Sequence, residues 1–180
     1  RRRVLERGQR AGQRATDPRR LLRRDRHAVG LQGQCGHRVG LAAIGAGIPI
    51  QEARGYMVAD IGGGTTDVAV ISLGGIVAST SVKCGGDKID QAIADFVKKQ
   101  FNLAIGDKTA EDVKIEIGSA VPVEEELSYT VKGRDFLQGL PRSAQISTNQ
   151  IVSAIDNELR TMIKAIKDVF AATPPELAAD

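Results

Sequence analysis

Three consecutive glycines between two β-rich segments constrain the fold of this chain more than any other feature. The flanking segments YMVADI (residues 56–61) and VAVISL (residues 68–73) have a strand-forming composition, and GGGTTD (residues 62–67) separates them. Consecutive glycines cost backbone entropy and pack no side chain, so they suit a sharp turn or a place where another group contacts the backbone. The sequence therefore predicts two neighbouring strands joined by a tight turn.

The same turn has the chemistry of an anion site. Bare backbone N–H groups in a tight turn form a concave cradle for anions, and the hydroxyls of Thr65 and Thr66 add donors for phosphate oxygens. Asp60 lies at the end of the preceding strand, where a carboxylate is placed to hold Mg²⁺ through water. A glycine-rich turn alone is a weak signal, so a plain hairpin turn stays open as the alternative.

Two better-known nucleotide motifs do not describe this turn. It lacks the pattern G-x-x-x-x-G-K-[ST], and the segment that follows it is a predicted strand. Both the Walker loop and the Rossmann fingerprint lead into a helix instead. A phosphate site in this chain would therefore lie between two strands.

The segments after the turn predict a third strand and then a helix. Gly74-Gly75 is a hairpin signal before IVASTSVK (residues 76–83), which gives three consecutive antiparallel strands. Asp87 is the expected N-cap of a helix whose apolar residues recur at helical spacing as far as Phe101.

Two more helices are predicted in the second half of the chain. One covers residues 109–120, with Thr109 and Asp112 as a capping box at its start. The other is long, carries a continuous apolar stripe and begins at a cap formed by Ser147 or Thr148.

A second hairpin is predicted between these two helices. Its strands cover residues 124–132 and 136–146, around a turn at residues 132–135. Together with the earlier strands and helices, this pattern indicates a chain of the α/β class.

The first forty residues differ in chemistry from the rest. Residues 1–40 hold 12 arginines, no lysine and three acidic residues, a net charge of +9, whereas residues 41–180 hold 13 basic and 19 acidic side chains, a net charge of −6. High charge with few apolar residues predicts disorder, and Arg-rich text is also what a GC-rich gene yields when read out of frame. We expect a disordered or aberrant segment; an arm that binds nucleic acid is the alternative.

Composition points to the cytoplasm. Two cysteines, Cys35 and Cys84, are too few for a disulfide scaffold and suit a reducing compartment. No run approaches the ~20 apolar residues of a membrane span, and no charged-then-apolar signal peptide opens the sequence.

Longer stretches of the sequence resemble a known family. DIGGGTTDVAV followed by GGDKID resembles the second phosphate motif of the superfamily of actin, sugar kinases and heat-shock chaperones. The stretches AAIGAGIPI, SVKCGGDKIDQAI, TAEDVKIEIGSA, VKGRDFLQGLPRS and PPELAAD, in this order and spacing, resemble the MreB, or rod-shape-determining, family of bacterial actin-like ATPases. The resemblance covers residues 41–180.

The resemblance implies a set of nucleotide-binding residues, with ATP and Mg²⁺ as cofactors. The hairpin glycines and threonines would contact the phosphates, Asp60 would lie near the metal, and the helix that opens Glu-Asp-Val-Lys would contact the ribose and adenine. The implied residues are Asp60, Gly62, Gly63, Gly64, Thr65, Thr66, Glu111, Asp112, Val113 and Lys114. A solvated helix face is the alternative for Glu111 and Lys114, and the family's usual arginine is replaced by Asp112.

The resemblance also implies a partial actin-like ATPase fold, with an RNase-H-like subdomain and a small outer α+β subdomain. Residues 41–102 would form the first part of the RNase-H-like core with the phosphate hairpin, and residues 103–144 the outer subdomain. Residues 145–180 would form a helix that returns to the core.

The function implied by the resemblance is that of an ATP-binding cytoskeletal protein that determines cell shape. Members of the family polymerise into membrane-associated filaments in the cytoplasm and organise cell-wall synthesis. The expected partners are other copies of the protein and the cell-wall elongation machinery at the inner membrane, and no nucleic acid.

Two parts of the family pattern are missing from the sequence. The first half, with its first phosphate loop, has no counterpart, and the family's Glu-Glu-Pro-Met, which includes the residue that positions the attacking water, reads His37-Arg38-Val39-Gly40. A reading-frame break just before Leu41 would produce this pattern, so we expect a truncated or frame-shifted product. Half a cleft predicts weak or undetectable ATP binding and no turnover, which leaves enzymatic activity uncertain.

Two other functions stay open as alternatives. One is another ATPase of the same superfamily, such as a chaperone or a pilus-assembly protein, but residues 124–143 resemble MreB and not the longer insertion of a chaperone. The other is an arginine-rich nucleic-acid-binding protein, against which the net charge of −6 on residues 41–180 argues.

Overall fold

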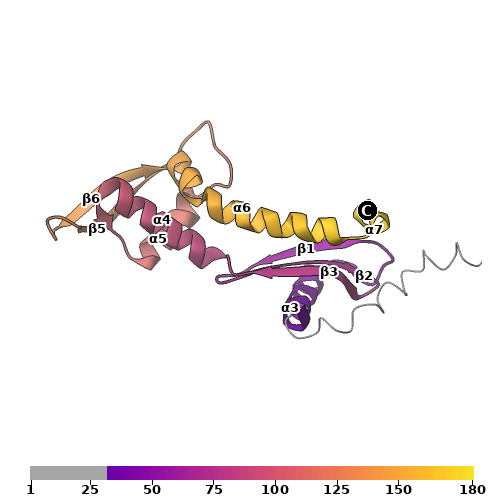
Figure 1. The fold of residues 1–180 in the computed structure, drawn as a ribbon. Helices are drawn as coiled ribbons and strands as arrows, with labels where there is room; N and C mark the ends of the chain where they lie inside the picture. The colour runs from indigo at the N-terminus through magenta and orange to yellow at the C-terminus, as the bar shows by residue number, and fades with distance from the viewer. Residues whose placement is uncertain (1–31) are drawn as a thin grey trace, which may run out of the picture. The chain divides into compact units, whose positions relative to one another are not determined.

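The computed structural model of the chain describes residues 32–180, and expectations for residues 1–31 lie outside the described residues. Figure 1 shows the helices and strands of the described part. In chain order they are α3 (Gln32–Gly45), β1 (Tyr56–Ile61), β2 (Thr66–Ser72), β3 (Gly75–Val82), α4 (Gly86–Phe101), β4 (Leu103–Ala104), α5 (Asp107–Ile117), β5 (Ser128–Asp135), β6 (Pro141–Ser147), α6 (Thr148–Ala172) and α7 (Pro175–Ala178).

The strands form two three-stranded sheets, in the orders β1-β2-β3 and β4-β5-β6. The chain divides into two compact units. Of the described residues, unit 1 contains those up to Val58 together with Val68–Thr80 and Val169–Asp180, and unit 2 contains Ala59–Asp67 and Ser81–Asp168. The glycine turn and the helix α5 therefore belong to the same unit, unit 2.

Helix α3 corrects the expectation for the end of the arginine-rich segment. We expected disorder as far as residue 40, but the helix begins at Gln32. Cys35, Val39 and Ala43 recur at a spacing of four residues, which places them on one face of a helix. All three are buried, in a cluster that includes Ile71 of β2. This apolar stripe outweighs the charged composition that favoured disorder.

The three strands around the glycine turn agree with the prediction. Consecutive strands are neighbours in the sheet, and a turn of four residues and one of two residues join them. The second turn consists of Leu73 and Gly74, both with positive φ, and Gly75 already begins β3. This is the conformation that a two-residue hairpin loop needs, and Gly74 adopts it without strain.

Unit 2 has its own apolar core. Helices α4 and α5 lie side by side, α4 packs on β4, and α5 packs on β5 (Figure 1). The buried members of the core are Ile93, Val97, Leu103, Ala110, Val113, Ile117, Val131, Ile146, Ile151 and Ile155. Because these side chains come from helices and strands far apart in sequence, the core fixes α5 relative to α4.

Both helices begin earlier than predicted. We expected Asp87 to cap α4, but the N-cap is Gly85 and Asp87 lies within the first turn, where its charge still favours the helix. We expected a capping box of Thr109 and Asp112, but α5 begins at Asp107 after an extended Gly106. In both cases an extended glycine replaces the side-chain cap that the pattern suggested.

The second hairpin is shifted relative to the prediction. We expected its turn at residues 132–135, but these residues continue β5, and the turn consists of residues 136–140. Asp135 explains the shift, because its Oδ1 accepts hydrogen bonds from the backbone N–H groups of Leu137 (2.8 Å) and Gln138 (3.0 Å). These two bonds, with Arg142 nearby, hold the pKa of the Asp135 carboxyl below its usual value.

Helix α6 begins at Thr148, so Ser147, the other predicted cap, is the residue before the helix, and its backbone N–H donates to Oε1 of Gln150 at 3.0 Å. Thr148 is buried, and its Oγ1 accepts a hydrogen bond from the backbone N–H of Leu127 at 3.2 Å. Although α6 is 25 residues long, neither it nor any other helix of the described residues is long and apolar enough to cross a membrane.

The core of unit 2 predicts a sharp contrast between two leucines. Replacing the fully buried Leu103 by alanine should lower the free energy of unfolding by about 2–5 kcal/mol, because it leaves a cavity. Replacing Leu137, which is 84% exposed, should change it by less than about 0.5 kcal/mol. Urea unfolding followed by circular dichroism measures both, and equal losses would contradict the assigned core.

Candidate nucleotide site

The glycine turn is a closed hairpin connection between β1 and β2. The backbone N–H of Gly62 donates to the carbonyl of Thr65 at 2.8 Å, which closes the turn. Gly63 and Gly64 lie at its tip and are exposed. The predicted tight turn is therefore present, with bare backbone at its most accessible point.

The N-terminus of α4 binds the carbonyl groups of this turn. The backbone N–H of Gly86 donates to the Gly62 carbonyl and that of Asp87 to the Gly63 carbonyl, both at 2.9 Å. The first N–H groups of a helix have no partner within the helix and carry its positive dipole end, so two carbonyl oxygens are favourable ligands for them. The turn is thereby fixed to α4.

This attachment sets the direction of the backbone N–H groups. In a trans peptide the carbonyl and the following N–H point in opposite directions within one plane. Since the carbonyls of Gly62 and Gly63 point into α4, the N–H groups of Gly63 and Gly64 point away from it. A Cβ added to Gly64 would meet no described atom within 4 Å, so the space beside this glycine is open. Two neighbouring donors that point away from the helix can bind an anion.

Gly85 makes this close approach possible. A Cβ on Gly85 would lie 2.4 Å from the carbonyl oxygen of Gly62 and 2.5 Å from that of Gly63. No side chain can be accommodated at such distances from backbone atoms. The glycine before α4 is therefore part of the site, although the sequence showed only that a helix should start there.

The two threonines of the turn have different roles. Thr65 is half-buried, and its hydroxyl donates weakly to Asp67 at 3.4 Å. Thr66, which we predicted to contact the ligand, is fully buried, and its hydroxyl donates to the Cys84 carbonyl at 2.7 Å. The Thr66 hydroxyl therefore supports the turn from inside, and its contact with a ligand stays a prediction. Burial and the charge of Glu158 raise the pKa of the Cys84 thiol, which disfavours a reactive thiolate.

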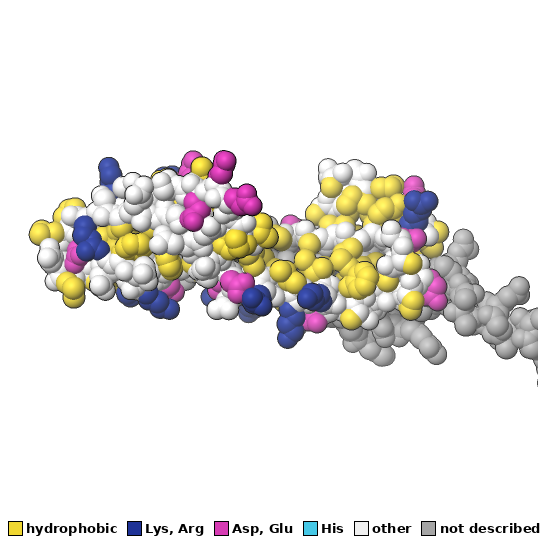
Figure 2. Space-filling view, turned by 90° about the horizontal axis from the view of Figure 1, so that it is seen from above, with side chains coloured by type: hydrophobic (Ala, Val, Ile, Leu, Met, Phe, Trp, Pro, Cys, Tyr) yellow, Lys and Arg dark blue, Asp and Glu magenta, His cyan; other side chains and the backbone are white. Residues whose placement is uncertain are grey.

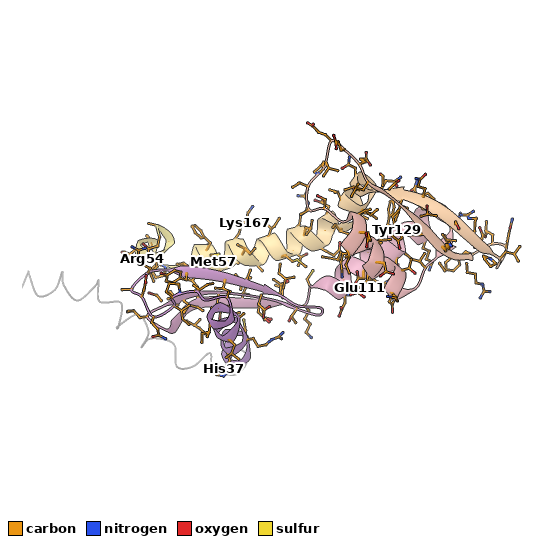
Figure 3. All side chains as sticks on the ribbon, turned by 180° about the vertical axis from the view of Figure 1, so that it is seen from behind. His37, Arg54, Met57, Glu111, Tyr129 and Lys167 are labelled. Atoms are coloured by element: carbon orange, nitrogen blue, oxygen red, sulfur yellow. The ribbon has the colours of Figure 1, made fainter. Side chains whose placement is uncertain are left out.

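The four residues of α5 that the resemblance assigned to the nucleotide site differ in their exposure to solvent. Glu111 is exposed on the outer surface of α5 (Figure 3). Asp112 is half-buried and forms a surface ion pair with Lys108 at 3.7 Å. Val113 is fully buried in the core of unit 2, so its side chain faces the core, and its assignment to the nucleotide site stays a prediction. The helical period explains this, because Val113 lies on the same face as Ala110 and Ile117.

Lys114 connects α5 with the glycine turn. Its Nζ donates to Oδ2 of Asp90 on α4 at 2.9 Å, and both side chains are mostly buried. The same Nζ and the Cα of Gly63 both lie within 4 Å of the position that a Cβ on Gly86 would occupy. The structure thus brings together two predicted site residues that are 51 positions apart in the sequence.

Asp90 is a residue of this site that sequence reasoning missed. Its Oδ1 is buried and has no hydrogen-bond partner among the described residues, so Lys114 provides the main compensation for its charge. Without Lys114 the carboxylate would be left buried and unpaired, which is costly. Asp90 lies one helical turn after the Gly-Gly-Asp sequence at the start of α4, and this position next to the glycine turn was the only sign in the sequence that it could belong to the site.

Asp60 fits a water-mediated metal better than a direct one. The carboxylate is half-buried at the end of β1. Across the described residues no group of three or more His, Cys, Asp or Glu side chains could hold a metal ion. A single carboxylate suits Mg²⁺, which keeps several waters and takes its remaining oxygens from substrate phosphates.

Comparison with known proteins connects this geometry to a family. The family model described as MreB/Mbl protein matches residues 36–180, so the match begins within α3. The chain is 48% identical over 139 residues to the cell shape-determining protein MreB of Escherichia coli (strain K12), covering 77% of this chain and 40% of that protein. It is 44% identical over 140 residues to the cell shape-determining protein Mbl of Bacillus subtilis (strain 168), covering 78% and 42%.

Solved structures show the same fold. MreB5 of Spiroplasma citri bound to AMPPNP is 44% identical, with a TM-score of 0.75 over 78% of this chain and 42% of that one. MamK in a double helical filament is 21% identical, with a TM-score of 0.61, which shows the fold alone. The described chain is therefore part of an actin-like ATPase fold, and it spans about two fifths of the relatives that it matches.

The contact between Gly85 and the turn predicts opposite results for two glycines. Gly85→Ala should destabilise the chain by about 1–3 kcal/mol, because the added Cβ displaces two backbone carbonyls from α4. Gly64→Ala should be nearly neutral, because its Cβ points into open space. Thermal unfolding of the two variants measures this contrast, and equal stability of both variants would refute the attachment of the turn to α4.

Proposed function

Because this chain belongs to the MreB/Mbl family, whose curated relatives are cell shape-determining proteins, we propose that its glycine turn binds the phosphates of ATP. The observation that carries the proposal is the orientation of the turn. With the carbonyls of Gly62 and Gly63 bound to α4, the N–H groups of Gly63 and Gly64 point away from that helix, and the space beside Gly64 is open. MreB5 of Spiroplasma citri, 44% identical to this chain, was solved with AMPPNP and with ADP.

Each remaining residue would have a separate task in nucleotide binding. Thr65 would donate its hydroxyl to a phosphate oxygen, and the cation of Lys114 would offset phosphate charge. Glu111, exposed on α5, would accept hydrogen bonds from ribose hydroxyls. Asp60 would hold Mg²⁺ through water, and the metal would supply charge neutralisation at the phosphates.

The cellular role of the chain follows from the family at a coarser level. We propose that the protein takes part in determining cell shape, as filaments that assemble at the membrane and organise cell-wall synthesis. Self-association is supported by the actin-like fold shared with MamK, which was solved as a double helical filament. The division into an RNase-H-like core (41–102 and 145–180) and an outer subdomain (103–144) belongs to the same proposal.

Titration with Mg-ATP, followed by backbone amide NMR, tests nucleotide binding even when the affinity is weak. Because only a few donors form the site, we expect binding in about the millimolar range. Chemical-shift changes should concentrate at Gly63, Gly64 and Thr65 and at the α5 residues Glu111 and Lys114. Shift changes confined to unit 1, or none at saturating nucleotide, would overturn the proposal.

Lys114→Ala should weaken Mg-ATP binding by about tenfold, because it removes a charge-assisted contact. Lys108→Ala is the matched control, since Lys108 lies on the same helix with its side chain 88% exposed and forms a surface ion pair with Asp112. If both variants lost the same affinity, the effect would reflect the net charge of α5 and not the position of Lys114.

A further inference from the structure

A hollow in the surface of unit 2 lies where the C-terminal end of α4 meets the turn between β5 and β6. Its volume of about 410 Å³ is within the range of pockets that accept ligands. Four of the residues that line it come from the end of α4 and its C-cap, and one comes from the turn: Asp95, Lys98, Lys99, Asn102 and Phe136. We call this site the α4 hollow.

Hydrogen bonds fix the walls of the α4 hollow. The backbone N–H of Phe136 donates to the Asn102 carbonyl at 2.9 Å, which ties the turn to the end of α4. The Arg142 guanidinium donates to the carbonyl of Phe101 and pairs with the Asp135 carboxylate at 3.0 Å. Because the hollow is preformed, binding a partner there costs the chain little conformational entropy.

Phe136 gives the hollow an apolar wall that is half open to solvent. Its side chain is 53% exposed, and Leu137 and Leu140 of the same turn are also exposed. Figure 2 shows hydrophobic atoms at the end of this hairpin, with Lys or Arg side chains close to them. An exposed aromatic ring that borders a concave site suits contact with an apolar side chain of a partner.

The charged side chains of the hollow favour an acidic partner. The Nζ of Lys98 lies 4.8 Å from the centroid of the Phe136 ring, and none of the ion pairs among the described residues includes Lys98 or Lys99. Among the described lining residues the only acid is Asp95, which accepts a hydrogen bond from Gln91 at 3.2 Å. Two cations thus accompany one carboxylate, although residues 41–180 as a whole carry a net charge of −6.

We propose that the α4 hollow binds an acidic segment of another protein. An apolar side chain of that segment enters the hollow and packs against Phe136, and neighbouring carboxylates pair with Lys98 and Lys99. The charge-assisted hydrogen bonds orient the segment, and the aromatic contact removes exposed apolar surface from water.

The same features favour a peptide over a nucleic acid. A phosphate backbone is bound through many cations, whereas two lysines line this hollow and the rest of the described chain is acidic. A phosphate chain also leaves the phenyl ring of Phe136 exposed, whereas an apolar side chain covers it.

This inference goes beyond the proposed function and does not depend on nucleotide binding. The glycine turn is bound to the first turn of α4, and the hollow lies at the other end of that helix. Because α4 has 16 residues, the two sites are about 22 Å apart along its axis. An experiment without ATP can therefore fail while the nucleotide site holds, and the reverse is equally possible.

Fluorescence anisotropy of a labelled peptide tests the binding directly. The probe is a fluorescein-labelled synthetic peptide in which glutamates flank a single phenylalanine. We expect its anisotropy to rise on titration with the full chain, with a dissociation constant of about 10–100 μM. The same peptide with glutamine in place of glutamate should bind about tenfold more weakly. Added salt should weaken binding of the acidic peptide, because the exposed lysines are screened.

A matched pair of lysine variants tests the location of the site. Lys98→Gln/Lys99→Gln should weaken peptide binding about tenfold or more, with an unchanged circular dichroism spectrum. Lys164→Gln/Lys167→Gln removes the same charge from exposed positions on α6 and should weaken binding less than about twofold.

A matched pair of phenylalanine variants tests the apolar contact. Phe136→Ala should weaken peptide binding about fivefold or more, because it removes the aromatic wall of the hollow. Phe170→Ala, at a side chain that is likewise 53% exposed, should leave binding unchanged.

The proposal fails on any of three results. One is an unchanged anisotropy of the acidic peptide with the unmodified chain. Another is an equal loss of binding in the two lysine variants, which would show an effect of net charge and not of the hollow. The third is a different occupant, shown by tighter binding of a labelled single-stranded oligonucleotide, or by self-association in sedimentation, that Lys98→Gln/Lys99→Gln alone abolishes.

Discussion

The hydrogen bonds between the glycine turn and the N-terminus of α4 are the constraint on which the site depends. They satisfy helix N–H groups that would otherwise lack partners, and they fix the orientation of two peptide planes in the turn. The helix thus does not itself bind an anion in this chain. Its positive end holds the carbonyls, and the turn presents its own N–H groups on the opposite side, about one residue's length further out.

The pair formed by Lys114 and Asp90 extends this arrangement to α5. A lysine at the surface would be mobile, but this one is tied to a partly buried carboxylate, and its position is set by the core that packs α5 on α4. The apolar residues Val113 and Ile117 of the same helix supply that packing. The location of this cation therefore rests on hydrophobic burial, which stabilises the packing of α5 on α4, while the ion pair with Asp90 orients the Lys114 side chain.

The sequence predicted local features better than contacts between distant segments. The strands around the turn and the start of α6 follow from composition and capping residues. The position of the β5–β6 turn did not, because Asp135 selects it through side-chain bonds to the backbone that no periodicity reveals. Thr66 and Val113 were assigned to the ligand because they lie within motifs, but a motif does not tell which of its residues face inward. Asp90 was missed because its partner is 24 positions away.

Gly85, Gly63 and Gly64 differ in how strongly the fold itself requires a glycine at each position. Gly85 is required by the fold, since two backbone oxygens lie where its Cβ would be. Gly63 is restricted more mildly, by the flexible Asp87 carboxylate at 2.8 Å. The fold does not require a glycine at position 64, because a Cβ there would have open space and the φ of this residue lies outside the left-handed region. A glycine at an exposed tip lowers stability, because it loses much backbone entropy on folding and has no side chain to pack. Close approach of a ligand to the backbone would give a physical reason for glycine at this position, which no contact within the described residues gives.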